Sequence, residues 1–255
     1  MQFDSYITAM LVSYLEMMEP ITPMFHLAYA VLLNRLVFFG NRFRATFGWF
    51  VTFHYIMFLF LPSGWLWVQL GKSGPASFSR MIANGIPFWF SGRGFGLSGL
   101  HFVLTIFLIT LWFSEAKSPK NDYDFRKVRW WNFWVVPLIL WGFIYPFSPA
   151  DGSGELTFLG LSALWRSSFG VLINPTSTFL LGLLTLIYPR VNFTLFLGSS
   201  LALLVLAAGS IPFSPLEWPL GILALYNIFI GSFHLIQKKI RTGVPAPNSE
   251  GRLAE

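Results

Sequence analysis

Long apolar segments recur along this sequence, and they limit its possible folds more than any other feature. Roughly 20 apolar residues are needed to cross the hydrocarbon core of a bilayer as a helix. Segments of this kind cover residues 21–39, 47–67, 95–113, 132–147, 175–188, 193–209 and 215–236. Only 11% of the 255 residues are charged, against about a quarter in soluble domains. The sequence therefore predicts an all-α polytopic membrane bundle of about seven transmembrane helices and excludes a soluble globular enzyme.

The basic residues predict the orientation of this bundle, because Lys and Arg gather on the cytoplasmic side of membrane proteins. If the N-terminus lies outside, thirteen of the 17 basic residues fall on the inner side and four on the outer side. The outer four are Lys72, Arg80, Arg93 and Arg166. We therefore expect a multi-pass protein of the cell inner membrane with its N-terminus outside and its C-terminus inside. Attraction to lipid headgroups explains the basic run at residues 117–129, so nucleic acid is not an expected partner.

Three regions are predicted along the chain. Residues 1–19 place apolar side chains at helical spacing, which predicts an amphipathic helix lying in the membrane interface. Residues 20–241 form the seven-helix membrane domain, whose first helix starts at Pro20, and residues 242–255 form a flexible cytoplasmic tail. Arg166 interrupts residues 156–173, and a central Arg costs at least about 2.5 kcal/mol in a membrane helix. We expect a re-entrant or interfacial segment there, with an eighth span as the open alternative.

All four histidines fall in or at the ends of predicted spans, where a buried imidazole needs a partner. His26 and His101 lie at similar depth on different helices, as a pair of axial ligands would. His54 and His234 lie closer to the inner surface. Hydrogen bonding between helices is favoured over ligation for such residues. The cofactor is therefore left unknown, with haem or chlorophyll held by His26 and His101 as an alternative that is not favoured.

One predicted span begins with an unusually polar sequence. Asn174-Pro175-Thr176-Ser177-Thr178 combines a proline at a helix start with three hydroxyls, which can present donors to a polar or anionic ligand. The candidate ligand-binding residues are therefore Asn174, Thr176, Ser177 and Thr178. The alternative is an ordinary helix start whose hydroxyls bond back to the backbone.

The sequence contains no visible catalytic constellation. It has no cysteine, which excludes thiolate chemistry and disulfides. Glu19 and Glu217 lie at the outer surface, and neither has a partner carboxylate at catalytic spacing. We interpret both as solvated ends of spans rather than ion ligands, and we expect no catalytic residue and no metal site.

Several residues carry a resemblance to a known family. They are Tyr14 followed by Pro20, the stretch at residues 169–178 that reads Phe-Gly-Val-Leu-Ile-Asn-Pro-Thr-Ser-Thr, and Gly209-Ser210 at the end of the sixth span. Together they resemble an uncharacterised family of bacterial integral membrane proteins whose most specific stretch is Phe-Gly-Val-x-Pro-Cys-Pro-Thr-Thr. This sequence has Asn174 in place of the Cys and Ile173 in place of the first Pro. The resemblance implies a membrane bundle and marks one segment, but it implies no activity.

The sequence thus favours a non-enzymatic integral membrane protein. Its expected role is to bind or transport a small ligand at the fifth-span entrance, or to act as a structural subunit of a larger membrane complex. Its expected partners are the lipid bilayer and other membrane subunits. The alternatives are an electron-transfer or photosynthetic subunit that binds haem or chlorophyll, and an intramembrane lipid-modifying enzyme, for which the sequence offers no acid and base pair.

Overall fold

The computed structural model describes residues 18–72, 100–145, 147–149, 156–167, 169–210 and 215–243. The interfacial helix predicted for residues 1–19 lies outside this part of the chain except for its last two residues. Residues 244–255 of the predicted tail also lie outside it, as do the basic residues Arg80 and Arg93.

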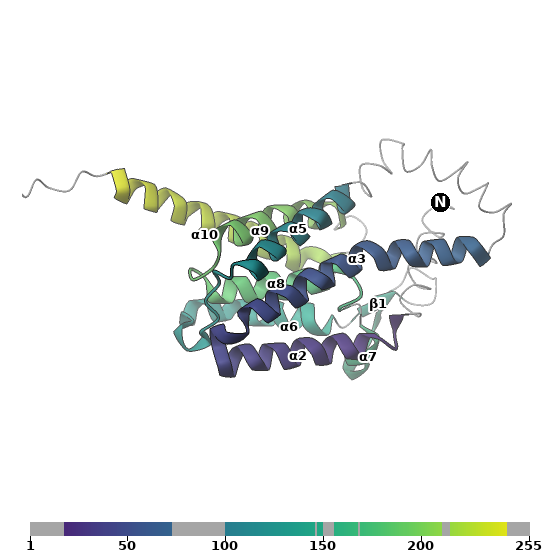
Figure 1. Ribbon diagram of the computed structural model, residues 1–255. Helices are drawn as coiled ribbons and strands as arrows, with labels where there is room; N and C mark the ends of the chain where they lie inside the picture. The colour runs from purple at the N-terminus through teal and green to yellow at the C-terminus, as the bar shows by residue number, and fades with distance from the viewer. Residues whose placement is uncertain are drawn as a thin grey trace, which may run out of the picture.

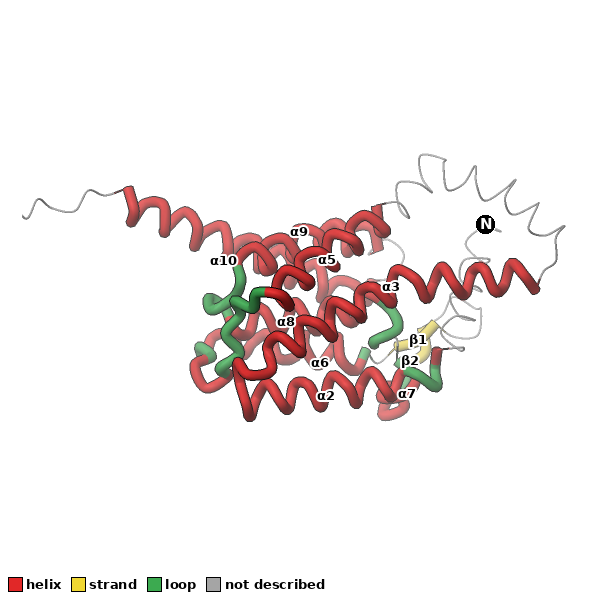
Figure 2. The backbone as a smooth tube through the Cα atoms, viewed as in Figure 1, coloured by secondary structure: helices red, strands yellow, loops and turns green. Residues whose placement is uncertain are grey.

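Helices make up nearly all of the described structure, which confirms the all-α prediction. The long ones are α2 (Thr22–Phe39), α3 (Arg44–Lys72), α5 (Leu100–Lys117), α6 (Val136–Ile144), α8 (Ile173–Ile187), α9 (Phe193–Ser210) and α10 (Trp218–Gly243). Each coincides with a predicted span, and successive helices alternate in direction along one axis (Figures 1 and 2). Pro20 does not start the first helix: it lies in the preceding turn, and Pro23 occupies the first turn of α2.

By length and composition alone, two described segments could cross a membrane, namely Thr22–Leu59 and Trp218–Gln237. Trp130–Ile144, Ile173–Ile187 and Phe193–Ala208 are apolar but shorter. Core helices of soluble proteins can meet the same criterion. The two segments therefore indicate membrane association without establishing seven crossings.

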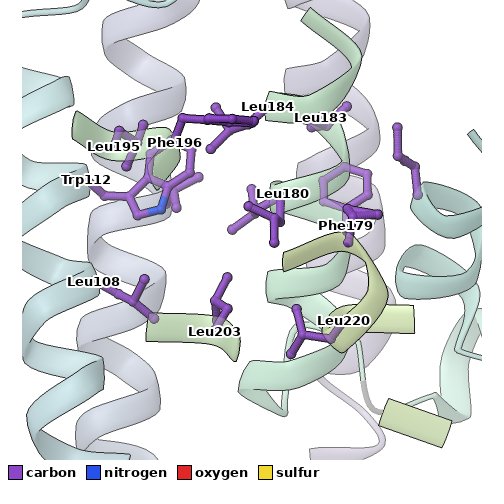
Figure 3. Packing of buried hydrophobic residues seen from close by; sticks show 14 of the residues in the cluster. Leu108, Trp112, Phe179, Leu180, Leu183, Leu184, Leu195, Phe196, Leu203 and Leu220 are labelled. Atoms are coloured by element: carbon purple, nitrogen blue, oxygen red, sulfur yellow. The ribbon is translucent and has the colours of Figure 1, made fainter. Parts of the chain in front are cut away.

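The helix α8 forms the centre of the bundle. Every residue from Pro175 to Ile187 is buried, because α6, α9 and α10 pack around this helix. Leu180, Leu183 and Leu184 of α8 lie in the same core as Trp112 of α5 and Phe196 of α9 (Figure 3). A helix that is enclosed by other helices on all sides is typical of a core position.

A glycine allows α6 to approach α8 very closely. A Cβ added at Gly142 would lie 2.6 Å from Phe179 N and 2.8 Å from Pro175 O, both in the backbone of α8. Small residues at such contacts let two helix backbones approach closely, which favours helix association where the hydrophobic effect does not. The entrance of α8 is therefore held against the C-terminal end of α6.

The segment between α6 and α8 contains no helix long enough for an eighth span in its described part. It contains a short antiparallel ribbon of β1 (Phe147–Pro149) and β2 (Leu156–Phe158), paired Phe147 with Phe158. A 3₁₀ turn and the four-residue helix α7 (Ala163–Arg166) follow. The described part of this segment is therefore irregular, and its re-entrant or interfacial placement stays a prediction.

Buried polar groups join the loops at the opposite end of the bundle, which we call the inner end (residues 40–43, 118–129 and 188–192). Glu115 is 1% exposed, and its Oε1 accepts hydrogen bonds from the backbone N–H groups of Lys120 and Asn121 at 2.9 Å. Asn192 Nδ2 donates to Glu115 Oε2 at 2.8 Å. These contacts tie the loop after α5 to the turn before α9.

Candidate functional site

A buried carboxylate lies at the entrance to α8, at the end of the bundle that we call the outer end. Glu217 closes the 3₁₀ turn η6 (Pro215–Glu217) just before α10, and its side chain is 7% exposed. The Tyr145 hydroxyl donates to Glu217 Oε1 at 2.9 Å. The Asn174 side chain also hydrogen-bonds to this carboxylate, as an amide donor. Three elements that are distant in sequence thus meet in one polar site, the Glu217 site (Tyr145, Asn174 and Glu217).

Burial changes the protonation of this carboxyl group. It raises the pKa of Glu217 from its ordinary value of 4.5 to about 7, while the hydrogen bonds from Tyr145 and Asn174 oppose the shift only in part. Glu217 lies just before the candidate span, which begins at Trp218. Near neutral pH the group therefore populates both the carboxylate and the carboxylic acid, so it can exchange a proton.

The described partners of Glu217 are neutral. Salt bridges within the described residues join Lys127 to Asp124 and Arg190 to Asp122, both at the inner end. A carboxylate that is buried among neutral donors remains under-compensated, because hydrogen bonds offset only part of its lost hydration. Such a group favours a proton or a bound cation.

Tyr145 has an unusual backbone conformation. Its φ of 38° and ψ of 76° place it in the left-handed region at the C-terminus of α6, and its N–H bonds to Trp141 O at 2.7 Å. Non-glycine residues rarely adopt positive φ, and they do so mainly where surrounding contacts impose it. Here the conformation ends α6 at the position from which the hydroxyl reaches Glu217.

The three predicted hydroxyl ligands bond within the protein. Thr176 Oγ1 accepts from Gly170 N at 2.9 Å and donates to Leu172 O at 3.0 Å. Ser177 Oγ shares a 2.8 Å hydrogen bond with Tyr55 Oη of α3. Thr178 Oγ1 donates to Asn174 O at 2.9 Å. Among the four predicted ligand residues, Asn174 is the one whose side chain the structure brings to the Glu217 site.

A second polar network supports the irregular backbone before α8. His54 Nε2 lies 2.7 Å from Gly170 O, and His54 Nδ1 lies 2.7 Å from Tyr29 Oη. Because a carbonyl oxygen can only accept, Nε2 carries the proton and Nδ1 accepts from the Tyr29 hydroxyl. The favoured prediction of hydrogen bonding between helices is confirmed for His54. The network satisfies backbone groups that have no helical partner.

His26, one member of the predicted histidine pair, lies against two backbone carbonyl groups. His26 is buried, with Nε2 2.8 Å from Phe143 O of α6 and Nδ1 3.1 Å from Thr22 O. An axial ligand needs a ring-nitrogen lone pair, so ligation by His26 would disturb one of these contacts. The side chain of His101 lies outside the described residues. Figure 1 shows α2 and α5 on opposite sides of α3 and α8. Binding of haem or chlorophyll by His26 and His101 stays a prediction.

Our interpretation of Glu217 as a solvated span end is wrong, because this residue is only 7% exposed. A signal was present in the sequence: Glu217 is a lone carboxylate at the outer start of the apolar stretch predicted as the seventh span. An ionisable residue in such a position indicates a functional site by default. Tyr145 had no comparable signal, because only the fold brings it to η6.

The described residues include no cluster of three or more His, Asp or Glu side chains that could hold a metal ion. No known protein family, curated protein or solved structure matches this chain.

Proposed function

We propose that this chain is a non-enzymatic, multi-pass protein of the bacterial inner membrane that binds a small monovalent cation at the Glu217 site. When the cation binds there, Glu217 releases a proton, and this exchange serves transport or sensing. The proposal includes seven crossings, an outer N-terminus, an inner C-terminus and membership of the uncharacterised family that residues 169–178 resemble.

The distribution of apolar side chains supports the membrane part of the proposal. The central helix α8 is buried on all sides, whereas large apolar side chains are exposed on the surrounding helices α2, α3, α5, α9 and α10. Examples are Met24, Phe53, Phe102, Leu201 and Phe229. Soluble monomers rarely expose apolar surface so widely, whereas a lipid-facing surface requires it.

One observation carries the ligand part: a buried carboxylate at the membrane boundary has neutral donors as its described partners. Asn174 and Tyr145 orient Glu217 without neutralising it. A small cation would gain the Glu217 carboxylate as its charged ligand, with side-chain or backbone oxygens completing the site. Because the pKa of Glu217 lies about 7, cation affinity should rise as pH increases from 6 to 8.

Proton release on cation binding tests this proposal. The full chain in lipid nanodiscs is titrated at pH 7 in weak buffer with NaCl, KCl or tetramethylammonium chloride, and the released protons are followed with a pH-sensitive dye. We expect saturable release with at least one of these cations. Glu217→Gln should abolish the release, while Glu19→Gln, which removes a second outer carboxylate, should leave it intact.

Tyr145→Phe adds an independent check of the site. The lost hydrogen bond had stabilised the carboxylate, so the pH midpoint of proton release should move upward. Release that persists in Glu217→Gln, or no saturable release with any of the three cations, would disprove cation binding at this site. Circular dichroism and gel filtration establish that each variant is folded.

A further inference from the structure

A cavity of about 370 Å³ opens at the inner end, between the C-terminus of α2 and the loop that follows α5. Val37, Phe38 and Phe39 contribute apolar groups to its lining, and Arg42, Asp124 and Arg126 contribute charged groups. The cavity is distant from the Glu217 site along the bundle, and nothing in the cation proposal uses it.

The apolar lining residues of this cavity belong to the exposed surface of α2. Val37, Phe38 and Phe39 are all exposed, with Phe38 at 69%. These residues end α2 where the chain turns at Gly40. An apolar wall at this level can pack against acyl chains, whereas a soluble anion would gain nothing from it.

The polar side carries excess positive charge. Arg42 and Arg126 line the cavity and are exposed. Asp124 is the opposing charge, but its Oδ2 forms an ion pair with Lys127 at 3.1 Å, and its Oδ1 accepts from Arg126 N at 3.2 Å. Lys127 and Arg126 both interact with the Asp124 carboxylate, so the positive charges around the cavity outnumber the negative one.

A third guanidinium group lies beside the cavity. Arg35 is held over the ring of Phe39 at 5.4 Å and over that of Phe43 at 6.0 Å. Cation–π contacts hold Arg35 near the apolar wall while it stays exposed. Guanidinium groups bind phosphate oxygens through paired N–H donors.

We propose that this cavity binds the headgroup of an anionic glycerophospholipid from the inner leaflet. The phosphate lies between Arg42 and Arg126, and the acyl chains lie along Val37, Phe38 and Phe39. The inference rests on the membrane embedding in the proposed function but not on the Glu217 site.

Native mass spectrometry of the detergent-extracted full chain tests this proposal. Phosphatidylglycerol or phosphatidylcholine is added, and the affinity of the first bound lipid is measured. The variant Arg42→Gln with Arg126→Gln should bind phosphatidylglycerol at least about tenfold more weakly than wild type, since it loses two charge-assisted contacts. The matched control, Lys238→Gln with Lys239→Gln, removes two charges near the C-terminal end of α10, outside the cavity lining, and should bind as wild type does.

Three results would overturn the proposal. Equal affinity for phosphatidylglycerol and phosphatidylcholine would show that the cavity does not recognise the charge of the headgroup. An equal loss of phosphatidylglycerol affinity in the two double variants would show only a general effect of surface charge. Displacement of phosphatidylglycerol by equimolar glycerol phosphate identifies a site for free phosphate esters rather than lipid. Extraction of the chain from membranes by carbonate, without detergent, would instead refute the membrane embedding. Glu217→Gln should leave the affinity for phosphatidylglycerol unchanged, because the cavity does not depend on the Glu217 site.

Discussion

At the scale of single residues, Gly170 shows how tightly the backbone before α8 is fixed. Its φ is +75°, and an added Cβ would lie 2.4 Å from Phe25 Cβ. Its N–H donates to Thr176 Oγ1, and its carbonyl accepts from His54. Both backbone groups of one glycine thus connect the irregular segment to α8 and α3.

Gly170→Ala should lower stability by about 3 kcal/mol, because a strained φ adds to overpacking against Phe25. Gly40→Ala is the matched control: Gly40 also has a positive φ, at +55°, but an added Cβ meets nothing within 4 Å. It should lose less than Gly170→Ala, because backbone strain at φ +55° and ψ −132° acts there without a steric contact. Thermal unfolding in detergent measures both variants. Similar losses would show that the contact with Phe25 contributes nothing.

Residue roles were the least predictable part of this sequence. The polar run at the start of α8 predicts Asn174 as a ligand residue, and it predicts the neighbouring hydroxyls equally, although these bond to the backbone or to Tyr55. The burial of Glu217 depends on how η6 packs, which no local sequence pattern reports. Long-range partners such as Tyr145 become visible only once helices are assembled.

At the scale of elements, the inner-end loops are held by ion pairs and amides. One carboxylate oxygen of Asp122 accepts a hydrogen bond from Arg190 Nη1 at 2.9 Å, and the other accepts one from Asn41 Nδ2 at 2.9 Å. Burial alone would raise the pKa of Asp122, but hydrogen bonds from Asn41, the Asp124 backbone and Arg190, together with the Arg190 charge, lower it overall. One carboxylate therefore joins the α2–α3, α5–α6 and α8–α9 connections.

This lowered pKa predicts an acid-sensitive contribution to stability. A carboxyl group whose pKa is lower in the folded state stabilises the protein above its unfolded pKa of about 3.9, and this stability is lost as pH falls through the folded value. Asp122→Asn should therefore melt below wild type at pH 7, and the difference should shrink toward pH 3. Melting curves across this range check the expectation. A difference that does not change with pH would mean that the charge of Asp122 is not involved.

Helices were predicted well because their signal is local. Apolar runs of helical length identified every long described helix, although α3 and α10 extend beyond their predicted bounds to Lys72 and Gly243. The structure between α6 and α8 was predicted only as irregular. The ribbon of β1 and β2 has three residues per strand, too few for an alternating pattern to be recognised.

At the scale of the whole molecule, the proposed topology requires α6 to cross the membrane. Lys117 at the end of α5 then faces the inner side, and Leu164 in α7 faces the outer side; both side chains are exposed. The chain has no cysteine, so a single introduced thiol reports its own position without background.

In spheroplasts, Leu164→Cys should react with a membrane-impermeant maleimide, whereas Lys117→Cys should react only after permeabilisation. Gel-shift of the labelled chain measures both. The reverse pattern would invert the orientation, and labelling of both positions from one side would show that α6 does not cross. Either result would contradict the proposed topology.

The enclosed position of α8 also bears on how the chain is made. Of the helices packed around it, α6 precedes it in the sequence, but α9 and α10 follow it. While a ribosome is still synthesising α9, α8 lacks the contacts that α9 and α10 make with it in the folded chain. The central helix of the bundle can therefore be fully enclosed only after the last helix has been made.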